Sequence, residues 1–230
     1  MMEHDKRLIE DYLPIEAISE RAVSEPRTKG HLSTLHVWRA RRPLIACRAA
    51  VYGALVPATR FVPQNGPEEK RASLGRANAA KFVERLCQYP GNPKTIAEAR
   101  RHILEAHAQR LSYEVGRSVM VEDIEAGRVP YPKVLDMFAG GGAIPLEAAR
   151  LGCESHALDL NPVAYLIELC TVTYPQRFGA GLADDVEKWG REVLQSTRQQ
   201  VADVLVRISA HERSHARCKF FRSTAPFFRR

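Results

Sequence analysis

The sequence lacks the cysteine pattern that zinc ribbons and secreted disulfide-rich proteins require. Its five cysteines are an odd number, they stand far apart, and no CxxC pair occurs. Because metal sites need clustered ligands and secreted scaffolds need a denser cysteine framework, we expect reduced thiols and no metal in this chain.

Long apolar runs are also missing. No stretch approaches the roughly 20 apolar residues that cross a bilayer, and the N-terminus has acids among its bases and no apolar signal-peptide core. These absences predict a cytoplasmic protein with no membrane partner. The chain has 45% hydrophobic residues, enough to fill a core, and a formal net charge of +7. That surplus favours DNA or another polyanion as a partner without requiring one.

The first 130 residues carry mostly helical signals. Apolar residues recur at helical spacing, and clusters of proline and glycine separate the segments. The pattern predicts helices over residues 43–56, 72–86 and 93–111, within a helical N-terminal domain over residues 1–130.

A change of pattern near residue 129 predicts a second domain over residues 131–208. A short apolar run ends in three consecutive glycines, which is typical of a buried parallel strand entering a tight turn. A compact helix, a second strand, a second helix and a long amphipathic helix over 182–208 follow. This order opens an α/β doubly wound unit. We therefore predict an α/β protein with a partial Rossmann-like core, and an irregular basic tail over residues 209–230.

The glycine turn admits three interpretations. A phosphate-binding P-loop requires Lys followed by Ser or Thr, and no such pair follows these glycines. The dinucleotide fingerprint requires glycine or alanine at the sixth position, which is Pro145 when counted from Gly140. The third interpretation is the S-adenosylmethionine-binding turn of methyltransferases, where glycines let the ligand approach the backbone closely.

Two acids fit the third interpretation. Asp136 ends the first predicted strand, and Asp159 ends the second, where one carboxylate can accept hydrogen bonds from both ribose hydroxyls. The turn could instead be tight packing, and Asp159 part of an ordinary helix cap; we favour ligand binding because both features occur in register. The predicted cofactor-binding residues of the two strand ends are Asp136, Phe138, Ala139, Gly140, Gly141, Gly142, Asp159, Leu160 and Asn161.

Two segments resemble a known family. VLDMFAGGGAIPLEAARLG and HALDLNPVAYLI are similar to the first two cofactor motifs of DNA amino-methyltransferases. The upstream stretch, with its WRARRPL block, resembles the N-terminal domain of adenine-specific DNA methylases that carry a domain of unknown function and a zinc ribbon. The resemblance implies a Rossmann-like methyltransferase that uses S-adenosylmethionine to methylate the exocyclic amino group of adenine in DNA.

The resemblance also bears on the WRARRPL region. In related methyltransferases, a segment with a histidine and a basic-Pro pair closes over the methionine end of the cofactor. His36, Arg42 and Pro43, with Arg41 beside them, resemble that segment. A surface arginine cluster that binds phosphate, or nothing in particular, explains these residues equally well.

The resemblance is incomplete. Related enzymes hold the flipped adenine with an [Asp/Asn/Ser]-Pro-Pro-[Tyr/Phe] loop, but this sequence has no Pro-Pro pair and no zinc-ribbon cysteines. We therefore expect a chain that binds the cofactor, has no catalytic residues of its own, and is a fragment or is completed by a second chain. The alternatives are a methyltransferase that acts on RNA or protein, and a non-enzymatic basic module that binds nucleic acid.

Overall fold

A computed structural model describes residues 6–26, 31 and 34–211 of the chain. The chain divides into two compact units, Met1–Arg177 and Phe178–Arg230. The predicted basic tail lies outside the described residues from residue 212 onward.

The first part of the larger unit is helical, as predicted. The prediction for residues 93–111 corresponds to a longer helix that begins at Pro93, where the Asn92 side chain accepts a hydrogen bond from the Lys94 amide at 2.9 Å. This helix ends where Gly116 adopts a φ of 70°. The elements are α1 (Leu8–Asp11), α2 (Ile15–Val23), α3 (Leu44–Leu55), the 3-10 turn η2 (Ala58–Phe61), α4 (Glu68–Leu86), α5 (Pro93–Val115) and α6 (Val121–Glu125).

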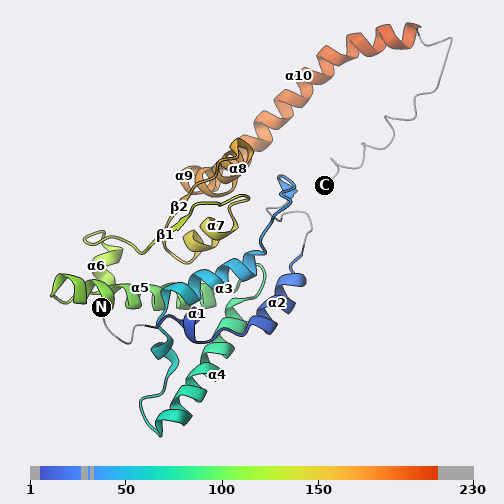
Figure 1. The fold of residues 1–230 in the computed structure, drawn as a ribbon. Helices are drawn as coiled ribbons and strands as arrows, with labels where there is room; N and C mark the ends of the chain where they lie inside the picture. The colour runs from blue at the N-terminus through green and yellow to red at the C-terminus, as the bar shows by residue number, and fades with distance from the viewer. Residues whose placement is uncertain (1–5, 27–30, 32–33, 212–230) are drawn as a thin grey trace. The chain divides into compact units, whose positions relative to one another are not determined.

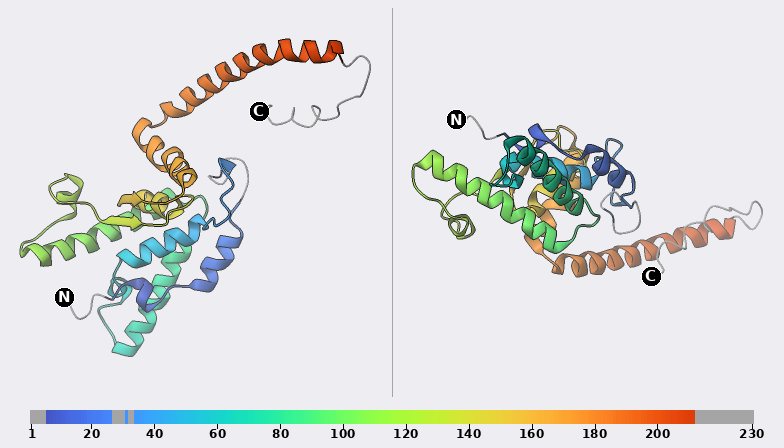
Figure 2. Two further views of the ribbon diagram at one scale, coloured as in Figure 1. Left: turned by 45° about the horizontal axis from the view of Figure 1, so that its top comes forward. Right: turned by 90° about the horizontal axis from the view of Figure 1, so that it is seen from below.

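A short β-α-β unit follows. Strands β1 (Lys133–Asp136) and β2 (Glu154–Ala157) pair in parallel, and α7 (Ala143–Arg150) connects them. Helix α7 lies between this sheet and α3, and α3 lies beside α5 (Figures 1 and 2). After β2 the chain continues as α8 (Pro162–Glu168), a π-helical turn η3 (Leu169–Thr173) and α9 (Tyr174–Phe178).

The prediction of a Rossmann-like methyltransferase core is wrong. The sheet of the described residues has two strands, in the order β1-β2, and most of the described chain is helical. The prediction extended one strand-turn-helix-strand unit to a layered α/β core, in which helices cover a larger parallel sheet. The rest of the described chain supplies no further strand to β1 or β2, so the β-α-β unit is a small addition to a helical body.

The β-α-β unit and the helices share one hydrophobic core. Ala148, Leu151 and Cys153 of the unit are buried in the same cluster as residues from α3, α4 and α5. That cluster therefore contains residues from both predicted domains, 1–130 and 131–208. Its large buried members from the helices include Leu8, Ile45, Tyr52, Phe82, Leu86 and Ile103.

A buried ion pair joins α3 to α7. Arg48 donates from Nε to Glu147 Oε2 at 2.6 Å and from Nη2 to Oε1 at 3.2 Å, and both side chains are fully buried. The guanidinium also donates to three carbonyl oxygens at and just after the end of α4, and Arg150 donates to Glu147 at 2.8 Å. Because buried charges are stable only when they are fully paired, this network fixes α7, and the turn before it, against the helices.

Most of the described residues of the second unit form one long helix, α10 (Gly181–His211). This confirms the helix predicted over 182–208. Several of its apolar side chains, among them Val186, Trp189 and Val193, are more than half exposed. In the described part of the chain, no helix combines the length and the apolarity that a bilayer crossing requires.

Candidate functional site

The turn after β1 is shaped by its glycines. Gly140 and Gly142 have φ angles of 54° and 73°, in the left-handed region that other residues rarely adopt. The Gly142 amide donates to the Ala139 carbonyl oxygen at 2.8 Å, which closes the turn before α7 begins. Ala139 is buried, whereas the Phe138 side chain is 80% exposed and points away from the core. The chain thus enters α7 through a compact turn of small residues.

Asp136 and Asp159 follow neighbouring strand ends, and both carboxylates bond to this turn. Asp136 Oδ1 accepts a hydrogen bond from the Phe138 amide at 3.0 Å. Asp159 Oδ2 accepts from the Gly140 amide at 2.8 Å, and its Oδ1 accepts from the Asn161 amide at 2.8 Å. The structure therefore brings the two predicted acids together at one glycine turn.

Backbone hydrogen bonds keep the Asp159 carboxyl charged. The amides of Asn161 and then Gly140 lower the pKa of this group from its ordinary value of 3.8, and they outweigh the opposite effect of burial. Two amide donors occupy about half of the roughly four acceptor positions of a carboxylate. Asp159 therefore has acceptor positions left for the hydroxyl groups of a ligand.

The other two predicted residues after β2 have different surroundings. Asn161 caps α8, because its Oδ1 accepts from the Val163 amide at 2.9 Å. The helix-cap interpretation therefore holds for this residue. Leu160 is 94% exposed, so its side chain is available to a ligand or a partner but contributes little to the fold.

Trp38 covers the glycine turn, a contact that the sequence did not predict. A Cβ added to Gly140 would lie 2.7 Å from the indole Nε1, and one added to Gly141 would lie 3.6 Å from the nearest Trp38 atoms. Since real Cβ atoms essentially never approach another heavy atom within 3.0 Å, the indole needs glycine at position 140. The signal in the sequence was the tryptophan of the WRARRPL block, two residues after His36.

The rest of that block is placed differently. His36 and Arg42 are exposed, and Pro43 directly precedes α3. Arg41 Nη2 donates to Glu25 Oε1 at 3.1 Å, and the buried Glu25 carboxylate also accepts from the first turn of α3. Arg41 therefore stabilises the start of α3, whereas the cofactor contacts predicted for His36, Arg42 and Pro43 stay predictions.

Glu168 also lies beside the turn, and the sequence did not predict it as a residue of this site. It ends α8, is only 6% exposed, and its Cγ would lie 3.4 Å from a Cβ added to Gly142. Its Oε1 is buried with no hydrogen-bond partner among the described residues. Burial, and then the charges of Asp159 and Asp136, raise the pKa of this carboxyl above its ordinary value. A single acid inside the otherwise hydrophobic segment from Val163 to Cys170 was the signal available in the sequence.

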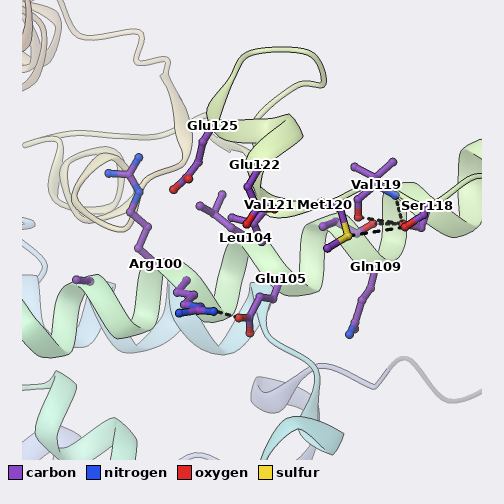
Figure 3. Close-up of a pocket in the computed structure, with 14 residues that line it drawn as sticks. Arg100, Leu104, Glu105, Gln109, Ser118, Val119, Met120, Val121, Glu122 and Glu125 are labelled. Carbon is purple, nitrogen blue, oxygen red and sulfur yellow. Dashed lines mark hydrogen bonds and ion pairs between the residues drawn. The ribbon is translucent and has the colours of Figure 1, made fainter.

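A groove of about 860 Å³ lies outside the predicted site. It runs along α5 and the segment 118–125, as Figure 3 shows, and none of the predicted site residues lines it. Its charged residues include both arginines and glutamates, and Glu105 is already bonded to Arg101 at 2.9 Å. The groove therefore has charges of both signs, whereas the residues Asp136, Asp159 and Glu168 at the turn are all acids.

Possible metal ligands are scattered. Among the described residues, no three His, Cys, Asp or Glu side chains form a group that could hold a metal ion. The sequence does contain one spacing that the expectation of no metal overlooked, since His211 and His215 flank Glu212 in the order His-Glu-x-x-His. Residues 212–215 lie outside the described residues.

The described cysteines are free thiols, as predicted. Cys47, Cys87 and Cys153 are buried and Cys170 is exposed, whereas Cys218 lies outside the described residues. Burial raises the pKa of Cys47 and of Cys153 to about 12. Because the thiolate is the reactive form, these two side chains act as core residues rather than nucleophiles.

Comparison with known proteins gives one match. The model of a protein family of unknown function, DUF1156, matches residues 12–82, which contain the WRARRPL block and extend from the end of α1 into α4. This agrees with the expectation of an N-terminal domain of unknown function, but the match ends before the glycine turn. The chain matches no curated protein and no solved structure.

Proposed function

We propose that the glycine turn between β1 and α7 binds S-adenosylmethionine. The observation that carries the proposal is the convergence of two carboxylates on that turn. Asp136 is the last residue of β1, Asp159 follows the adjacent end of β2, and the two bond to amides only two residues apart, those of Phe138 and Gly140. Ligands of parallel β-α-β units bind beyond the carboxyl ends of the strands, which is where these acids lie.

The residues at the turn fit this cofactor in two respects. The remaining acceptor positions of Asp159 suit the two neighbouring hydroxyls of a ribose. The buried Oε1 of Glu168 has no donor of its own, so it could pair with a positively charged group of the cofactor. Bound S-adenosylmethionine would supply an electrophilic methyl group, and this chain's residues would bind the cofactor and orient it.

The proposed methyl acceptor is the exocyclic amino group of adenine in DNA. This part of the proposal rests on the resemblance of the FAGGGAIP and WRARRPL segments to DNA methylases, and the net charge of +7 favours a phosphate-rich partner. The loop that holds the flipped base would come from a second chain, because the sequence has no Pro-Pro pair. At the strand ends Leu135, Met137 and Leu158 are each more than half exposed, and such apolar side chains suit contact with a partner.

We expect Asp159→Ala to weaken S-adenosylmethionine binding about 10- to 150-fold. Hydrogen bonds to a charged group contribute roughly 1.5–3 kcal/mol each, and every 1.4 kcal/mol is about tenfold in Kd. Isothermal titration calorimetry of the full chain with S-adenosylmethionine measures the effect.

Asp123→Ala is the matched control. Asp123 accepts a hydrogen bond from the Met120 amide at 2.9 Å, so this variant also loses a backbone cap, but in α6 rather than at the turn. It should keep the affinity of the unmodified chain. Equal affinities of the unmodified and Asp159→Ala chains would contradict the proposal, and no binding at all would leave the non-enzymatic nucleic-acid-binding module as the better account.

A further inference from the structure

Three carboxylates meet at the glycine turn without a counter-charge. Asp136 and Asp159 bond to its amides, and Glu168 packs against Gly142, where α7 begins. Burial, and then the charges of both aspartates, raise the pKa of the Glu168 carboxyl. Among the described residues, none of the three takes part in an ion pair. The turn therefore has an excess of negative charge.

Of the three carboxylates, that of Glu168 has the fewest hydrogen-bond partners. Its side chain is more than nine-tenths buried, and its Oε1 has no hydrogen-bond partner in the described part of the chain. An unpaired buried carboxylate destabilises a fold, so such a group requires an explanation. The π-helical turn Leu169–Thr173 begins directly after it, and π-helical turns occur frequently at functional sites. A ligand that brings a positive charge to this position would supply the missing partner.

S-Adenosylmethionine carries such a charge, and its product does not. The sulfonium adds one positive charge to the amino-acid zwitterion. When the methyl group passes to a neutral amino nitrogen, the electron pair of the broken S–C bond stays on sulfur, the nitrogen lone pair forms the new N–C bond, and an amino proton passes to water. S-Adenosylhomocysteine is then a neutral thioether. A cluster of carboxylates of which one, that of Glu168, is buried therefore distinguishes the two ligands by charge.

We propose that Glu168 binds the sulfonium end of S-adenosylmethionine and makes the site prefer this cofactor over S-adenosylhomocysteine. This inference rests on the function proposed above. In this arrangement Asp159 binds the ribose, which both ligands share. Glu168 pairs with the positive charge of the sulfonium, which only the methyl donor has. The product then leaves more readily than the cofactor.

Titration of both ligands into the unmodified chain and into two variants tests this inference. The unmodified full chain should bind S-adenosylmethionine at least about tenfold more tightly than S-adenosylhomocysteine. Glu168→Gln should weaken binding of S-adenosylmethionine about tenfold and change binding of S-adenosylhomocysteine by less than about twofold. Glu154→Gln is the matched control, because it removes the same charge from an exposed position on β2 and should leave the preference unchanged.

Thermal denaturation of the ligand-free chains separates a binding role from a structural one. Because Glu168→Gln removes an unpaired buried charge, Tm should stay the same or rise. A lower Tm together with equal weakening of both ligands would make Glu168 a structural residue and overturn the inference. An unchanged preference would also overturn it and leave the proposed function intact. If the unmodified chain binds neither ligand, both proposals fail.

Discussion

Replacing Glu147 with glutamine is expected to lower the free energy of unfolding by about 3–5 kcal/mol, the cost of leaving a buried charge without its partner. Arg48 is fully buried and donates to both oxygens of the Glu147 carboxylate. Glutamine keeps the shape of the side chain, but it leaves the guanidinium without a counter-charge. Since Arg150 also donates to Glu147, the variant disturbs a second cation at the same point.

Urea unfolding followed by circular dichroism measures this loss. Glu98→Gln is the matched control, because Glu98 pairs with Arg85 at 3.6 Å on the surface, where both side chains are about half exposed. Exposed pairs contribute about 0–1 kcal/mol, so the control should change stability little. If the two variants lost the same small amount, the Arg48–Glu147 pair would not be what holds α7 against the helices.

Substitution of Gly140 by alanine is expected to displace Trp38 and abolish detectable cofactor binding. The residue has a φ of 54°, and a left-handed conformation costs a residue with a Cβ about 1–2 kcal/mol. The new methyl group would also lie 2.7 Å from the indole Nε1, a distance that forces the indole to move. The variant therefore changes both the backbone and the cover of the proposed site.

Tryptophan fluorescence reports on the displacement. The chain has two tryptophans, and Trp189→Phe leaves Trp38 as the single emitter. In that background Gly140→Ala should shift the emission to longer wavelength, as water reaches the indole. Gly141→Ala is the control, since its Cβ would lie at an ordinary 3.6 Å from Trp38 and its φ is outside the left-handed region. An unshifted spectrum for Gly140→Ala would show that Trp38 does not lie on the turn.

Local signals predicted the elements but not their assembly. Helix α5 and the strand-turn-helix of β1 and α7 follow from apolar spacing, caps and glycines, which act over a few neighbouring residues. The size of the sheet depends on whether later segments pair with β1 and β2, and no local pattern decides that. The Arg48–Glu147 pair joins residues 99 positions apart, so the packing of α7 could not be predicted either.

Local signals likewise predicted some residues of the candidate site and not others. Asp136 and Asp159 could be predicted, because each lies at the end of a strand and the ends of parallel neighbours meet at one edge of the sheet. Trp38 and Glu168 reach the turn from segments about 100 residues before it and about 26 residues after it, through tertiary packing alone. Residue type also did not reveal the contact of Arg41, which stands in the expected basic-Pro segment and bonds to the buried Glu25.

Hydrogen-deuterium exchange of the full chain, with and without S-adenosylmethionine, tests the central claim most directly, because it shows where a ligand binds. We expect slower exchange at the amides of residues 138–142, the glycine turn, and of residues 159–163, where α8 begins. Protection confined to other segments, such as the groove along α5 in Figure 3, would contradict a cofactor site at the turn, as would unchanged exchange at saturating cofactor.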